Sequence, residues 1–267
     1  MKVVIEAQNK PAAEPTVSVV TVFLMNLWAY PALILWTLFC IFVFPFLFGL
    51  GLLLLRWPAD RLTRWFIWLY GRGWFLLMSP FVRFDREQMA LINVAEPHLF
   101  VVNHFSFFDT FCMALLPVHN IIFAVRSWPF RMFWYGSFMR LARYLDVEGD
   151  RWENILDSCK KAFSSNGSVL FFPEGHRSRD GQLQRFYSGG FKVAIAAGVP
   201  VLPLCINGTD RLLPPGRKLM RPCRICLRAL EPIDTANFNG EDGHIQLRKL
   251  VKSRMARSLA EMRGEER

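Results

Sequence analysis

Charged side chains are absent from a long stretch near the start of this 267-residue sequence. Residues 15–55 contain no Asp, Glu, Lys or Arg, and the stretch is about twice as long as the ~20 apolar residues that a spanning helix needs. Its length excludes an ordinary soluble domain. A cleaved signal peptide also fits poorly, because its apolar core is only about 7 to 15 residues long and comes after a basic start. We therefore predict a membrane anchor that is retained.

Acidic side chains are scarce as well. The 22 acidic residues are outnumbered by 32 basic ones, which gives a formal net charge of +10. Such a surplus suits nucleic acid or an anionic membrane surface equally well. The hydrophobic content of 52%, with 25 Phe and 9 Trp, excludes a disordered chain and favours lipid. We expect membrane lipids as partners and no nucleic acid.

Cysteines are few and do not form a metal-binding pattern. Of the six, only Cys223 and Cys226 are spaced as Cys-x-x-Cys, without the second cysteine pair or the histidine pair that a zinc site usually adds. The pattern of residues 223–230 is more typical of a strand. We predict no metal site and no cofactor, with reduced thiols in the cytosol.

Two prolines divide the uncharged stretch, and we expect the helix to break at Tyr30-Pro31 and at Phe44-Pro45. The pieces are then short, so a helical hairpin that dips into the membrane competes with one tilted span and a subsequent interfacial helix. Basic residues just after the stretch place the remainder of the chain on the cytoplasmic side. We expect residues 1–75 to form the anchor and residues 76–267 a cytoplasmic domain. The basic residues are Arg56, Arg61, Arg64 and Arg72.

Past residue 80, short apolar runs alternate with helical segments, which is typical of an α/β domain. We predict a mixed, largely parallel sheet flanked by helices and preceded by hydrophobic membrane helices. The basic and apolar faces of residues 244–262 indicate a packed surface helix, with membrane contact as the alternative. The expected strands are 99–102, 121–125, 169–172, 201–206 and 225–230, and the other expected helices are 107–116, 129–142, 150–165 and 189–197.

Polar residues come directly after the first and third of these strands. The carboxyl ends of parallel strands meet at one edge, where open α/β sheets place their sites, so we expect the two clusters to lie together. In the first cluster we expect Ser106 to cap a helix whose first turn holds Asp109. The Asp109 carboxylate would then reach back to the His104 imidazole and stabilise the imidazolium that forms when His104 accepts a proton.

The second cluster, residues 174–178, suits a phosphate group. Gly175 can adopt backbone angles that are closed to other residues, and Arg177 offers a planar fork for phosphate oxygens. We expect Glu174 either to accept hydrogen bonds from a polyol or to orient Arg177. Taken alone, the same residues would also suit a solvated loop.

Together, Asn103-His104-x-x-x-x-Asp109 and Phe172-Pro-Glu-Gly-His-Arg-Ser178 resemble the motifs of the glycerophospholipid acyltransferase family, whose type member is 1-acylglycerol-3-phosphate acyltransferase. Val199-Pro-Val-Leu-Pro-Leu-Cys-Ile206 is similar to a Pro-containing strand of that family, and the resemblance covers about residues 80–230. It implies a catalytic dyad and a site for the phosphate of the acceptor. The dyad is His104 and Asp109, and the phosphate site is Glu174, Gly175, Arg177 and Ser178, with Arg126 as a further candidate.

The sequence departs from the family pattern at three places. Arg126-Ser-Trp-Pro129 and Gly136 match only loosely a stretch that usually contains Lys. No Arg comes directly after Asp146, and Tyr187 stands where family members commonly have Lys. Because these positions help to hold the head group of the acceptor in relatives, the sequence supports catalysis better than the identity of the acceptor.

The resemblance implies transfer of a fatty acyl group from acyl-CoA or acyl-carrier protein to the hydroxyl of a lysolipid, with 1-acylglycerol-3-phosphate as the first candidate and other lysolipids open. A lipid hydrolase and a non-catalytic lipid-binding protein of the same fold are the alternatives. We do not expect Ser106 or Ser178 to be nucleophiles, because neither lies in a Gly-x-Ser-x-Gly turn.

Overall fold

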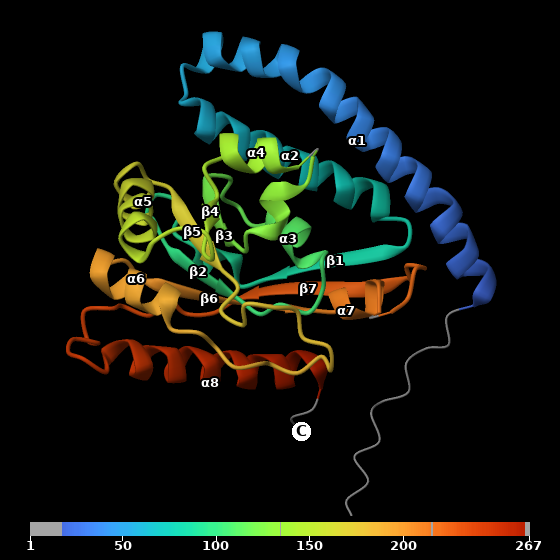
Figure 1. Ribbon diagram of the computed structural model, residues 1–267. Helices are drawn as coiled ribbons and strands as arrows, with labels where there is room; N and C mark the ends of the chain where they lie inside the picture. Colours follow the sequence, from blue (N-terminus) through green and yellow to red (C-terminus); the bar gives the residue numbers. More distant parts are fainter. Residues whose placement is uncertain (1–17, 134, 215, 265–267) are drawn as a thin grey trace, which may run out of the picture.

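The computed structural model describes residues 18–133, 135–214 and 216–264. Its centre is a seven-stranded sheet with the order β1-β7-β6-β2-β5-β3-β4 (Figure 1). The strands are β1 (Val82–Glu87), β2 (Leu99–Val102), β3 (Ile121–Val125), β4 (Leu145–Asp146), β5 (Ser168–Phe171), β6 (Val201–Asn207) and β7 (Cys223–Ala229).

Most of the sheet is parallel. The strands β6, β2, β5, β3 and β4 all run in one direction, whereas β7 is antiparallel to β6 and β1 is parallel to β7. This confirms the predicted mixed, largely parallel sheet. β2 pairs directly with β5, with Leu99 opposite Val169. The residues just after these two strands therefore meet at one edge, as expected.

All five expected strands are present, and Cys223 and Cys226 lie on β7. Two further strands were not expected. β1, at the edge of the sheet, has only two apolar residues, Val82 and Phe84, and ends in three charged ones, so its apolar pattern is weak. β4 has only two residues, which is too short to show any pattern.

Helices cover both faces of the sheet (Figure 1). Leu99 and Val101 of β2 point into a core shared with α5, α6 and α8, while Phe100 and Val102 point into a second core shared with α1, α2 and α3. The helices are α1 (Val19–Leu55), α2 (Ala59–Met78), α3 (Asp109–Cys112), α4 (Gly136–Leu141), α5 (Trp152–Ser164), α6 (Gly189–Ala197), α7 (Thr209–Leu212) and α8 (Gly243–Arg263), with short 3-10 turns at Met89–Leu91, Met113–Leu115 and Trp128–Arg131.

The predicted breaks in α1 at Tyr30-Pro31 and Phe44-Pro45 are wrong. The helix continues through both prolines, and Figure 1 shows it as one curved helix. Each proline removes only one backbone donor, and its fixed φ suits a helix. Ending the helix at either proline would leave many more backbone groups without intrahelical partners. Within the described residues, α1 alone is long and apolar enough to cross a membrane.

The expected boundary between residues 1–75 and residues 76–267 falls inside α2. Trp74, Phe75 and Met78, near the end of this helix, are buried in the second core. The helix thus packs as part of the α/β domain while it also runs beside α1 (Figure 1). Residues 1–17 of the expected anchor lie outside the described residues.

The last helix, α8, packs on the sheet through its apolar side, as predicted. Leu247, Val251, Met255 and Leu259 are all buried in the first core. α8 covers the face of the sheet opposite to α1 and α2 (Figure 1). Its apolar side is therefore used within the protein, and its basic side faces solvent.

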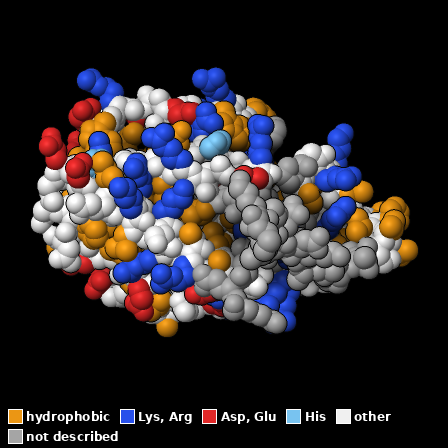
Figure 2. All heavy atoms as spheres, turned by 90° about the horizontal axis from the view of Figure 1, so that it is seen from below, with side chains coloured by type: hydrophobic (Ala, Val, Ile, Leu, Met, Phe, Trp, Pro, Cys, Tyr) orange, Lys and Arg blue, Asp and Glu red, His pale blue; other side chains and the backbone are white. Residues whose placement is uncertain are grey.

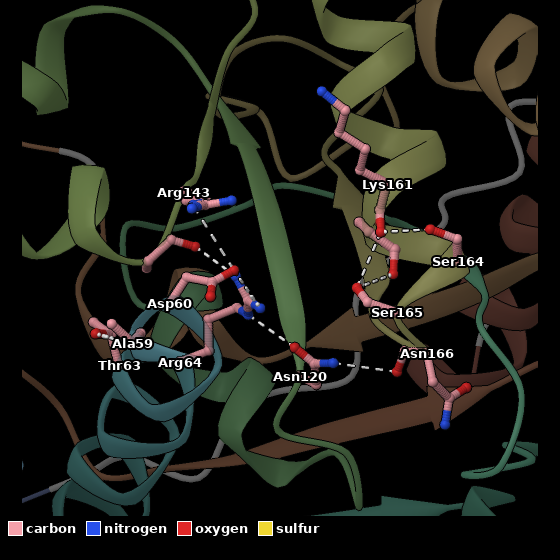
Figure 3. A network of polar contacts seen from close by, with 12 residues as sticks. Ala59, Asp60, Thr63, Arg64, Asn120, Arg143, Lys161, Ser164, Ser165 and Asn166 are labelled. Atoms are coloured by element: carbon pink, nitrogen blue, oxygen red, sulfur yellow. Dashed lines mark hydrogen bonds and ion pairs between the residues drawn. The ribbon is translucent and has the colours of Figure 1, made fainter. Parts of the chain in front are cut away.

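A buried arginine ties α2 to the amino-terminal edge of the sheet (Figure 3). The Arg64 side chain is only 4% exposed. It donates to Asn120 Oδ1 (2.9 Å), to the carbonyl of Ala142 (2.8 Å) and to Asp60 Oδ2 (3.1 Å). The Asn120 amide, just before β3, donates in turn to the carbonyl of Asn166, just before β5 (3.2 Å). This network fixes one end of α2 against two strands and α4.

Replacing Arg64 by Ala should lower the free energy of unfolding by about 3 kcal/mol, because it leaves buried acceptors without donors. Denaturant unfolding of the full chain in detergent measures the change. Arg86→Ala, at an exposed position on β1, is the matched control and should change stability by less than about 0.5 kcal/mol. Equal stabilities of the two variants would contradict this account of the network.

Candidate active site

The helix after β2 begins later than expected. α3 starts at Asp109, and the residue before it, Phe108, provides no side-chain cap. The prediction that Ser106 caps this helix is therefore wrong; its hydroxyl accepts only a long hydrogen bond from the Phe108 N–H (3.4 Å). The Asp109 N–H instead donates to the Ser106 carbonyl (3.2 Å), and the Asp109 carboxylate folds back onto the N–H groups of Phe105 and Ser106.

The Asp109 carboxylate is fully buried. Its Oδ2 atom accepts from His104 Nδ1 (2.8 Å), from the Phe105 N–H (2.6 Å) and from the Ser106 N–H (2.8 Å). Its Oδ1 atom accepts from the hydroxyl of Thr209. An ionised carboxylate can only accept hydrogen bonds, so the hydrogen shared with His104 is carried by Nδ1. In the neutral imidazole, Nε2 is then the unprotonated nitrogen.

The His104 residue is held from several sides. Its N–H donates to Glu174 Oε1 (2.8 Å), and its carbonyl accepts from the Ser178 N–H (2.8 Å). Its ring stacks on Phe172, with 4.3 Å between the ring centroids. The side chain is 17% exposed. Because Asp109 occupies Nδ1, Nε2 is the ring atom that can take a proton from a substrate.

Glu174 lies in a different environment from the one expected. The residue is fully buried, and its second oxygen, Oε2, accepts from the Gln184 N–H (2.8 Å). Burial raises the pKa of the Glu174 carboxyl, and the N–H donors of Gln184 and His104 oppose that shift. Neither oxygen bonds to Arg177. The carboxylate instead joins the loop after β2 to the loop after β5, which is a positioning role.

The remaining residues of the expected phosphate site lie on the same loop. Gly175 has φ +70°, and a Cβ atom there would be 3.0 Å from the Tyr187 ring. The backbone angle and the nearby ring explain why a glycine occupies this position. Ser178 is buried, and its hydroxyl donates to Asp180 Oδ1 (2.7 Å). Arg177 is exposed and has no polar partner among the described residues. Of this set, only Arg177 presents its polar group to an incoming anion.

Arg126 is not part of this cluster. It comes after β3, which is separated from β2 by β5, so about 10 Å of sheet lie between them. Its Nε donates to Glu148 Oε1 (2.7 Å). The Ser127 N–H also donates to Glu148 (3.0 Å), and together Ser127 and Arg126 lower the pKa of the Glu148 carboxyl. The guanidinium of Arg126 is thus already paired.

Two buried residues at this edge were not predicted as site residues. Thr209, the first residue of α7, donates to Asp109. Asn103 joins β2 to β6, since its Nδ2 donates to the Ile206 carbonyl (2.8 Å) and its Oδ1 accepts from the Ile206 N–H (2.8 Å). The sequence feature that could have indicated Thr209 is its position just after an expected strand that ends at the same edge of the sheet. The residues around Thr209 form no motif that would identify it as a site residue.

Comparisons with known proteins agree with the motifs. A family model described as Acyltransferase matches residues 83–207. The chloroplastic 1-acyl-sn-glycerol-3-phosphate acyltransferase BAT2 of Brassica napus is 30% identical over 167 residues, which are 59% of this chain and 47% of that protein. The 1-acyl-sn-glycerol-3-phosphate acyltransferase of Escherichia coli (strain K12) is 36% identical over 98 residues, which are 37% of this chain and 39% of that protein.

A solved structure extends the similarity to nearly the whole chain. The 1-acyl-sn-glycerophosphate (LPA) acyltransferase PlsC from Thermotoga maritima superposes with a TM-score of 0.74 and 26% sequence identity, over 91% of this chain and 96% of that one. The alignments span about half the length of the first curated relatives. These matches and the sheet define an α/β domain of the acyltransferase class. The matches agree with the resemblance to the glycerophospholipid acyltransferase family that the sequence motifs predict.

Replacing Thr209 by Val keeps the side-chain shape but removes the hydroxyl that donates to Asp109. A hydrogen bond to a charged group is worth about 1.5–3 kcal/mol, so we expect kcat to fall about 10-fold or more, with KM little changed. Thr209→Ser restores the donor and should recover most of the activity, as steady-state acyl-transfer kinetics would show. Full activity of the Val variant would mean that the Asp109 orientation does not depend on this bond.

Proposed function

We propose that this chain is a membrane-bound acyltransferase that moves a fatty acyl group from an acyl thioester to the hydroxyl of 1-acylglycerol-3-phosphate, which gives phosphatidic acid. The pairing of His104 Nδ1 with the buried Asp109 carboxylate, which leaves Nε2 available, carries this proposal. The names of the relatives from Brassica napus and Escherichia coli support the choice of acceptor.

In this reaction His104 is the general base. Its Nε2 takes the proton of the acceptor hydroxyl while the hydroxyl oxygen attacks the carbonyl carbon of the thioester. The carbon–sulfur bond then breaks, the thiolate leaves, and the imidazolium returns the proton to sulfur. Asp109 stabilises the imidazolium between these steps. General-base action of this kind contributes about 10²- to 10⁴-fold.

Direct transfer needs no acyl-enzyme, because a thioester already has a good leaving group. The geometry of the two candidate serines supports this route. Ser106 is buried and its hydroxyl accepts from a loop N–H. The Ser178 hydroxyl donates to Asp180. Neither hydroxyl is bonded to His104, the partner that would have to activate a serine nucleophile.

The acceptor phosphate is best matched by Arg177. Its guanidinium is exposed on the loop after β5, which His104 contacts through the Ser178 N–H. A planar guanidinium binds two phosphate oxygens at once. Tyr187, 60% exposed beside Gly175, borders the same loop. In this proposal Arg177 orients the acceptor, while Glu174 and Ser178 keep the loop in place.

The membrane location rests on α1. Many of its large apolar side chains are exposed along the helix, and transferring such a surface to lipid is strongly favourable. We place α1 in the membrane and the α/β domain on the cytoplasmic side, which Arg56 and Arg61 directly after α1 favour. The acyl donor is then a water-soluble thioester, acyl-CoA or acyl-carrier protein.

His104→Ala should lower acceptor-dependent thiol release by about 10²- to 10⁴-fold, because it removes the base. The assay supplies purified full chain, acyl-CoA or acyl-carrier protein, and a panel of lysolipids, and monitors the free thiol. His244→Ala on α8 is the matched control and should keep full activity. Thiol release that needs no acceptor would instead identify a hydrolase, and equal rates in wild type and His104→Ala would exclude the mechanism.

Arg177→Ala should raise KM for 1-acylglycerol-3-phosphate about 10-fold, because a charge-assisted hydrogen bond is lost. The effect on kcat at saturating acceptor should be small. A monoacylglycerol, which lacks phosphate, should show no change in KM. Arg254→Ala, an exposed arginine on α8, serves as the control. A KM that stays constant would show that the head group is bound elsewhere.

A further inference from the structure

A short basic segment lies between α7 and β7. It consists of Arg217, Lys218, Leu219, Met220 and Arg221, which we call the 217–221 segment. Its three basic residues are all exposed, and none has an acidic partner among the described residues. Leu219 is also 55% exposed. The segment therefore offers three unpaired positive charges around one apolar side chain.

Hydrogen bonds from α1 hold the segment in place. Asn26 Nδ2 donates to the Met220 carbonyl (2.8 Å), and Asn26 Oδ1 accepts from the Met220 N–H (2.9 Å). The Tyr30 hydroxyl donates to the carbonyl of Lys218. Asn26 is a buried amide in an otherwise apolar stretch of helix, where an unpaired polar group would be costly. The contact is thus a specific junction between α1 and the 217–221 segment.

The outer surface of α1 at this junction is apolar. Phe23 and Leu27 are more than 60% exposed, one turn or less from Asn26. Figure 2 shows basic side chains beside hydrophobic ones at the right-hand end of the molecule, where α1 begins. An apolar surface bordered by cations is the arrangement that meets a membrane with its apolar side in the acyl chains and its charges among anionic head groups.

We propose that the 217–221 segment binds the anionic head groups of the leaflet in which α1 lies. It thereby adds a lipid-binding site distinct from the catalytic cluster. The proposal goes beyond the acyl-transfer function but rests on the placement of α1 in the membrane. The segment is also connected to the candidate site. The Arg221 N–H donates to the carbonyl of Leu212 (2.8 Å) at the end of α7, and α7 begins with Thr209, which donates to Asp109.

The geometry favours a lipid surface over an acidic protein. α8 carries an equally basic exposed side, with Lys249, Arg254 and Arg257, but it lies on the opposite face of the sheet from α1 (Figure 1). A flat bilayer that covers α1 can reach the 217–221 segment and cannot reach α8 at the same time. Moreover, the apolar side of α8 is buried in the core, whereas the α1 surface beside the segment is open.

The test is lipid binding by the full chain in nonionic detergent micelles, measured by the anisotropy of fluorescent phosphatidylglycerol. The triple variant Arg217→Gln, Lys218→Gln and Arg221→Gln should weaken this binding on the order of 10- to 100-fold. The matched control removes the same charge from α8, as Lys249→Gln, Arg254→Gln and Arg257→Gln, and should change binding less than about 2-fold. Binding of fluorescent phosphatidylcholine should be the same in all three proteins. Thermal unfolding confirms that each variant is folded.

Two results would overturn the proposal. Unchanged phosphatidylglycerol binding in the triple variant would show that the segment does not meet anionic lipid, and would leave an acidic soluble protein as its partner. Equal losses in both triple variants would show an effect of net charge rather than of this surface. Because the readout is lipid binding and not thiol release, the acyl-transfer proposal and this one can fail independently.

Discussion

The hydrogen bonds to the buried Asp109 carboxylate are the interactions on which the candidate site depends. A charge removed from water is stable only when donors surround it, and here the donors come from the loop after β2 and from α7 after β6. They meet because β6 lies next to β2 in the sheet. The orientation of the His104 imidazole therefore depends on the strand order as much as on the residues of the motif.

Glu174 is a second buried carboxylate, and it binds the backbone of His104 rather than the side chain. Asp109 holds the imidazole of His104, whereas Glu174 binds its backbone N–H and, through Gln184, the far end of the loop after β5. Each oxygen of the two carboxylates accepts at least one hydrogen bond from the protein. The loop that carries Arg177 is thereby fixed relative to Nε2 before any acceptor binds, which reduces the ordering cost of binding.

The helices α1 and α2 are attached to the α/β domain at both edges of the sheet. Arg64 on α2 binds the amino-terminal edge at Asn120, and Asn26 on α1 binds Met220 near the carboxyl edge. Two separated attachments prevent the helices from pivoting on the sheet. In the proposed membrane location, they would hold the catalytic edge at a constant angle and depth, which suits an acceptor that stays in the bilayer.

Sequence periodicity alone determined much of this protein, because patterns within one segment report which faces are buried. It located five strands, the apolar side of α8, the long uncharged stretch, and the shared edge of the His104 and Glu174 clusters. It failed where the cause is not local. Pro31 and Pro45 lie inside α1 without ending it, and Ser106 does not cap α3, because that helix begins only at Asp109. Only the tertiary structure brought Thr209 to Asp109 and gave both Glu174 oxygens to backbone N–H groups. These partners are far apart along the chain, and no local pattern records a hydrogen bond that forms only when the sheet has assembled.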